Sequence, residues 1–156
     1  MIRSLAAMPA LGASESSRRA GVRPILETLA GAGRFQTLIT ALAATGLSRR
    51  FTGPGSWTLF APSDHAFERL PILLVRALLE DADRLRSLLL LHVIDGEYPE
   101  KDLVPFSRIP SVAGVDLPFS RDDHGETLVH GVPILTADIL AANGIVHEMD
   151  GVILPD

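Results

Sequence analysis

Residues 58–70 read TLFAPSDHAFERL, and this stretch decides the fold because a pattern typical of a strand changes halfway along to one typical of a helix. Trp57–Phe60 is a short run of aromatic and branched residues, which favours a β-strand. Pro62 lacks an N–H group and cannot extend a central ladder of strand hydrogen bonds. Ser63 and Asp64 are both good N-cap residues, so either one can begin a short helix. The stretch therefore predicts a strand that is followed at once by a helix.

Helical patterns flank this stretch on both sides. Before it and after it, apolar residues recur at steps of three and four, which is typical of helices with one buried face. Gly31-Ala32-Gly33 interrupts the first pattern, so we expect two helices there rather than one. The expected helices are Pro24–Ala30, Arg34–Thr45, Ile72–Glu80 and a segment that Asp81 or Asp83 caps and that ends near Leu90.

Short strands dominate the second half of the chain. From residue 92 onward, brief apolar runs are separated by Gly, Pro and Asp, which favours small antiparallel strands. Thr136–Ala142 differs, because it predicts one or two helical turns that Asn143-Gly144 ends. Helices first and strands later predict a single α+β domain. The expected strands are His92–Ile94, Val112–Phe119, Thr127–Val129, Pro133–Leu135 and Ile145–Met149.

The composition limits the classes of function. Hydrophobic residues make up 47% of the 156 residues, which is enough for the core of one domain. The net charge of −5 argues against nucleic acid as a partner, because such partners call for a basic surface. The absence of Cys excludes disulfides, thiolate catalysis and Cys-ligated metals. No apolar run reaches the ~20 residues of a membrane span.

Two further features concern the origin and the start of the chain. The chain has 13 Arg but a single Lys, Lys101, and since Lys has A/T-rich codons this bias indicates a G+C-rich, bacterial genome. Residues 1–23 predict a leader that is either flexible or a weak signal-like segment, because Arg3 precedes an Ala-rich stretch that contains Pro9.

The sequence carries no motif of a known catalytic or metal site. It has no G-x-S-x-G elbow, no P-loop and no H-E-x-x-H. The five His residues are scattered, so no metal-ligand spacing emerges. We therefore expect no catalytic residues, no metal and no cofactor.

Three segments, taken together and in order, resemble the fasciclin (FAS1) domain family. They are Thr58–Leu70, quoted above, then Leu88–Leu103 (LLLLHVIDGEYPEKDL) and Asp138–Pro155 (DILAANGIVHEMDGVILP). The resemblance implies a FAS1-like β-wedge of short, mostly antiparallel strands packed with several α-helices. It places the domain at residues 24–156.

The resemblance also implies a function. Family members are extracellular, periplasmic or cell-surface proteins linked to adhesion, and they are not generally enzymes. We therefore expect an adhesion or interaction module that binds a protein or a cell-surface or matrix polymer. The alternative is a carrier that holds a small apolar ligand in a cleft between the helices and the β-wedge.

The resemblance points to four candidate partner contacts. Leu91 and His92 stand where the family often has a Tyr-His pair, so Leu91 departs from the family pattern. Asp138 and Ile139 form an Asp-Ile pair, and a pair near this position has been tied to integrin recognition in some family members.

Structural explanations exist for the same positions. A buried neutral imidazole needs a donor and an acceptor partner, so we interpret His92 first as tying its strand to residues 58–64. We interpret Asp138 first as a helix cap. The other motif residues are expected to be structural: Thr58, Phe60, Ala61, Pro62, Asp64, Phe67, Asn143, Gly144 and His147.

Overall fold

A seven-stranded sheet and the helices packed against it make up the computed structural model, which describes residues 23–155. The predicted leader therefore lies outside the described residues, apart from Arg23. The strand order is β2-β1-β7-β6-β5-β4-β3, and every pairing is antiparallel except that of β1 with β7. The strands are β1 (Trp57–Pro62), β2 (Val93–Asp95), β3 (Arg108–Pro110), β4 (Asp116–Arg121), β5 (Thr127–Val129), β6 (Val132–Ala141) and β7 (Gly144–Met149).

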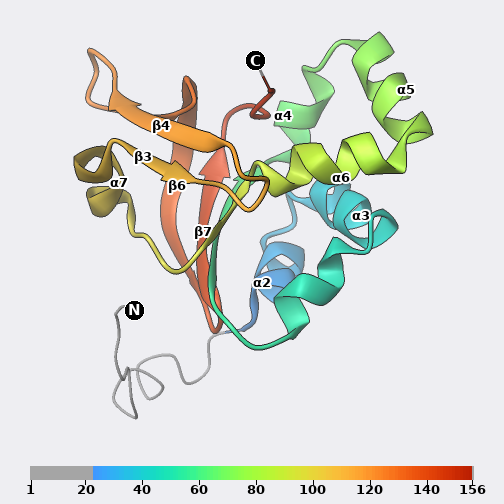
Figure 1. The fold of residues 1–156 in the computed structure, drawn as a ribbon, viewed down its shortest axis with the longest axis horizontal. Coiled ribbons are helices and arrows are strands. Elements are labelled where there is room, and N and C mark those ends of the chain that lie inside the picture. Colours follow the sequence, from blue (N-terminus) through green and yellow to red (C-terminus); the bar gives the residue numbers. More distant parts are fainter. Residues whose placement is uncertain (1–22, 156) are drawn as a thin grey trace.

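Helices from the first half of the chain lie together beside one part of this sheet (Figure 1). Helix α5 occupies the outer upper corner of that group, whereas α7 lies apart, next to β3 and β4. The helices are α2 (Ile25–Ala32), α3 (Gln36–Ala44), α4 (Asp64–Glu68), α5 (Ile72–Glu80), α6 (Ala82–Leu90) and α7 (Glu100–Phe106), with a 3-10 helix η2 (Leu47–Thr52). The α+β class with mostly antiparallel strands is confirmed.

The deciding stretch folds as a strand followed by a helix, and its two candidate caps have separate roles. Ser63 caps α4, because its Oγ accepts a hydrogen bond from Ala66 N at 3.2 Å. The Asp64 carboxylate instead accepts from Thr37 N, in the first turn of α3, at 2.7 Å. Asp64 therefore attaches one helix to the start of another, which satisfies an N–H that a helix end leaves free.

The core lies between the helices and the sheet. Phe60 is fully buried, and Phe67 is half-buried and packs against the core. Ala61 and Pro62 are buried at the end of β1 and lie opposite Glu148 and Met149 of β7.

Two predictions about the second half were wrong. Residues 136–141 belong to strand β6 and Ala142 to the turn that follows, so they do not form helical turns. The prediction failed because register shifts on either side of Thr136 break the in-out alternation that marks a strand. Helix α7 was not predicted, although Pro99 followed by acidic residues in the next turn is a typical helix start. Pro105 inside α7 conceals the pattern.

The corner between β6 and β7 joins three other segments. Asn143 Oδ1 accepts from Ile25 N at 2.8 Å, and its Nδ2 donates to Phe51 O at 2.7 Å. Its backbone carbonyl accepts from Trp57 N at 3.1 Å. Gly144 is required for space and not for an unusual φ, because a Cβ there would lie 2.1 Å from the carbonyl oxygen of Trp57.

We predict that Asn143→Ala lowers the free energy of unfolding by about 2 kcal/mol or more, since two backbone groups lose their partner. Asn143→Asp keeps the acceptor for Ile25 N but loses the donor for Phe51 O, so its loss should be intermediate. Urea unfolding measures both, with the exposed Asp123→Ala as control. Equal stability of Asn143→Ala and the control would contradict this role.

Candidate functional site

His92 is a buried structural link. Its Nδ1 lies 2.9 Å from Leu88 O, and its Nε2 accepts from Ile153 N at 2.9 Å. The ring is therefore neutral, with its proton on Nδ1. Burial lowers the pKa of His92 to about 4, although the bond to Leu88 O opposes this shift. Through these two hydrogen bonds the ring connects the segment after β7 to the end of α6.

The predicted tie between His92 and residues 58–64 exists, but the backbone makes it. The carbonyl oxygen of His92 accepts from Phe60 N at 2.8 Å, whereas the imidazole bonds elsewhere. Leu91 is buried as well. Neither side chain presents a surface to a partner in this fold, so the structure argues against Leu91 and His92 as partner contacts.

A chain of hydrogen bonds around His147 fixes the segment that leads into α7. His147 is fully buried and stacks on the Phe60 ring, with the ring centroids 5.6 Å apart. Its Nε2 donates to Tyr98 O at 2.9 Å, and its Nδ1 accepts from Asp138 N at 3.1 Å. Thr58 Oγ1 continues the chain, because it accepts from Tyr98 N at 2.8 Å and donates to Gly96 O. Burial lowers the pKa of His147, against the opposing effect of its bond to Tyr98.

Asp138 occupies an irregular point of β6 with a φ of 58°. Its carboxylate accepts from Glu100 N, the first residue of α7, at 2.9 Å. Asp138 thus satisfies the start of a helix as expected, but that helix is α7 and not residues 136–142. The side chain is 49% exposed, whereas Ile139 is half-buried. Of the four candidate contacts, Asp138 is the one with the most accessible surface.

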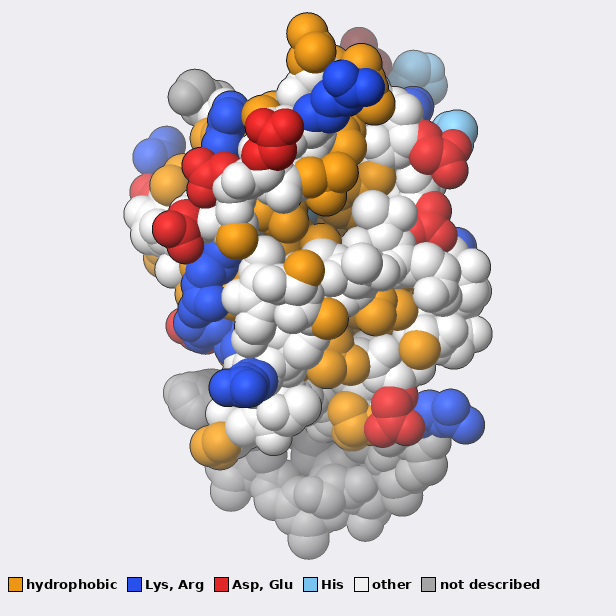
Figure 2. Space-filling model, turned by 90° about the vertical axis from the view of Figure 1, so that its right-hand side faces the viewer, with side chains coloured by type: hydrophobic (Ala, Val, Ile, Leu, Met, Phe, Trp, Pro, Cys, Tyr) orange, Lys and Arg blue, Asp and Glu red, His pale blue; other side chains and the backbone are white. Residues whose placement is uncertain are grey.

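Helix α5 presents an apolar surface that the sequence analysis did not identify. Ile72 is 66% exposed, Leu73 75% and Leu79 74%, and only Leu78 of this helix is fully buried. Hydrophobic side chains gather at the top of the molecule in Figure 2, where Figure 1 places α5. The sequence ILLVRALLE does indicate this surface, because the helix is apolar on nearly all sides. Packing one face against the domain leaves its other apolar side chains exposed.

Within residues 23–155, the His, Asp and Glu side chains form no group of three that could hold a metal ion. Across the same residues, no helix has both the length and the apolar character needed to cross a bilayer.

The buried imidazoles predict a loss of stability in acid. Below pH 6.5 unfolded His92 takes up a proton, whereas folded His92 stays neutral to about pH 4. Stability is therefore lost as pH falls through this window, by up to about 3 kcal/mol for His92, and His147 acts in the same direction.

His92→Gln should reduce this pH dependence, and His124→Gln, at an exposed position, should not. Urea unfolding at pH 7 and pH 4.5 measures the difference. An unchanged pH dependence in His92→Gln would show that His92 does not carry the effect.

Comparison with known proteins agrees with this fold. The profile of the Fasciclin domain matches residues 33–155. Two Synechocystis proteins, sll1735 and sll1483, are 35% and 37% identical to the chain over 83% and 84% of its length, which covers 96% and 73% of theirs. The cell surface glycolipoprotein MPB83 of Mycobacterium bovis is 30% identical over 65% of the chain and 44% of its own length.

A solved structure supports the same fold. The FAS1 domain pair of the insect cell adhesion molecule fasciclin I superposes with a TM-score of 0.71 and 19% identity, over 85% of this chain and 51% of that one. The profile match covers most of the chain, and the sheet and helices follow the same architecture. The chain therefore belongs to the fasciclin domain family.

Proposed function

We propose that this chain is an adhesion or interaction module that works outside the cell, at the cell surface or in the periplasm, and binds a protein or a cell-surface polymer. Its similarity to a cell surface glycolipoprotein and to the fold of a cell adhesion molecule supports this role. The proposal assigns no catalytic step to the chain.

The apolar surface of α5 is the observation that carries the proposal. Ile72 and Leu79 lie seven residues apart, so they share one face two helical turns apart. Leaving three large apolar side chains more than half exposed is costly for a free protein and favourable for one that buries them against a partner. The alternative role, a carrier of an apolar ligand, requires an enclosed apolar cavity. The groove beside η2 is open and lined by arginines, which does not suit such a ligand.

Asp138 is the second proposed contact. Its carboxylate bonds to Glu100 N, yet half of the side chain faces solvent and can meet a partner. Asp138→Asn separates the two roles, because it keeps an acceptor oxygen for Glu100 N while it removes the charge.

We predict that Ile72→Glu with Leu79→Lys lowers binding of the purified full chain to cells of the producing organism at least tenfold. The pair leaves net charge unchanged and suits the helix dipole, so stability should stay within about 0.5 kcal/mol. The matched control is Val115→Glu with Leu140→Lys, two apolar residues that are exposed elsewhere on the domain. Flow cytometry with labelled protein measures binding.

If the two double variants lost binding to cells equally, α5 would not be the binding surface. Location is tested separately, by fractionating cells and sequencing the N-terminus of the native protein. A protein found only in the cytoplasm would overturn the proposed role outside it.

A further inference from the structure

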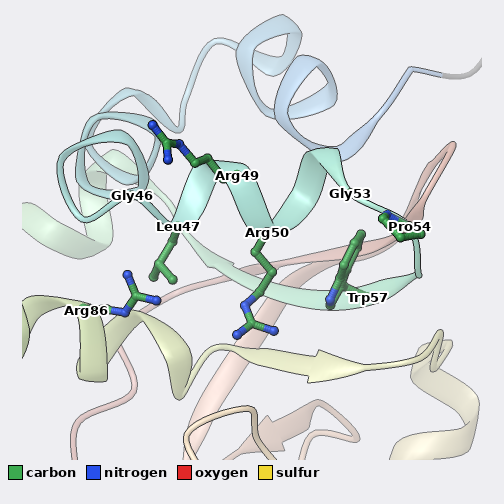
Figure 3. Close-up of a pocket in the computed structure, with 8 residues that line it drawn as sticks. All are labelled: Gly46, Leu47, Arg49, Arg50, Gly53, Pro54, Trp57 and Arg86. Atoms are coloured by element: carbon green, nitrogen blue, oxygen red, sulfur yellow. The ribbon is translucent and has the colours of Figure 1, made fainter.

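An open groove of about 480 Å³ lies between η2 and α6, on the part of the domain away from α7 (Figure 3). Its wall includes Leu47, Arg49, Arg50, Pro54, Trp57 and Arg86. We call it the arginine groove. None of the motif residues that carry the family resemblance lines it, so it is distinct from the sites described above.

The charge of the groove is opposite to that of the protein. Three of its lining residues are Arg and none is Asp or Glu, in a chain of net charge −5. The side chains of Arg49 and Arg50 are exposed and pair with no carboxylate within residues 23–155. Arg86 is held in place, because its Nη1 donates to Thr45 O at 2.9 Å. The exposed guanidinium of Arg50, which has no carboxylate partner, and the guanidinium of Arg86 favour a ligand with negative charge.

Trp57 adds an uncharged hydrogen-bond donor to the lining of the groove. The side chain is only 5% exposed, and its ring packs edge-on against Phe51 at a centroid distance of 5.4 Å. Its indole N–H donates to no group within residues 23–155. Figure 3 shows this nitrogen on the same side of η2 as the Arg50 guanidinium, whereas Arg49 points the other way. Because this nitrogen is not among the buried polar atoms of the described residues, solvent reaches it, and an acceptor on a ligand can take the place of that water.

We propose that the arginine groove binds a carboxylate-bearing polysaccharide. Arg50, Arg86 and the Trp57 N–H are three donors for the oxygens of an acid group, and arginine binds carboxylates with two parallel hydrogen bonds. Pro54 is exposed and adds apolar surface beside them, which suits the apolar face of a sugar ring. The open shape lets a polymer chain lie across the groove. This inference rests on the proposed function, because a module outside the cytoplasm meets such polymers.

The test uses the purified full chain and polygalacturonate, with neutral dextran as the uncharged comparison, in titration calorimetry. The wild type should bind polygalacturonate and not dextran, and higher salt should weaken binding. Arg50→Ala should lower the affinity about tenfold and Trp57→Phe severalfold. Arg84→Ala removes the same charge from α6 outside the groove, so it should change affinity less than twofold.

Equal losses in Arg50→Ala and Arg84→Ala would overturn the proposal, since a general charge effect would then explain binding. Binding to phosphatidylglycerol vesicles but not to polygalacturonate would overturn it in favour of a membrane surface.

The α5 double variant should still bind polygalacturonate. If polymer binding is absent while cell binding still depends on α5, this inference fails and the proposed function stands. If polymer binding persists in a protein that stays in the cytoplasm, the proposed function fails instead.

Discussion

The rest of the domain depends on the hydrogen bonds that Asn143 makes. From one hairpin corner it bonds to the start of α2 and to the end of η2, while its carbonyl oxygen bonds to the start of β1. Gly144 beside it allows β1 to approach closely enough for the parallel β1–β7 pairing inside the sheet. The helical half and the sheet half therefore share one anchoring point. Two of the elements that line the arginine groove, η2 and β1, are bonded directly to this corner.

Buried polar groups supplement the hydrophobic core in a chain that has no disulfide to support it. His92 and His147 are neutral imidazoles that each bridge two backbone groups from distant segments. Glu148 is also buried, and its carboxylate pairs with Arg34 at 3.0 Å. Each of these groups is satisfied, so each specifies a unique position for the loop or helix that it contacts.

Much of the fold follows from the sequence because local patterns and three ordered motifs agree. The helices up to residue 90 and the strand at Trp57–Phe60 follow their apolar spacing closely. The prediction for residues 136–142 was wrong, because a bulged strand loses the alternation of buried and exposed residues by which a strand is recognised. The candidate contacts were only partly predictable, since exposure is set by distant segments: Leu91 and His92 are covered, whereas α5 is left open. The arginine groove is lined by residues from η2, β1 and α6, and no local sequence pattern predicts that these residues lie close together.

The parallel pairing of β1 with β7 has a consequence for how the protein is made. Trp57 lies opposite Gly144, and His92 contacts Ile153, so this strand pair and the His92–Ile153 hydrogen bond join segments that the ribosome produces far apart in time. The helical first half emerges before the strand that completes its sheet exists. Contacts between such distant segments form slowly. The domain therefore stays open until almost all of residues 23–155 have been synthesised, and it reaches its compact form only afterwards.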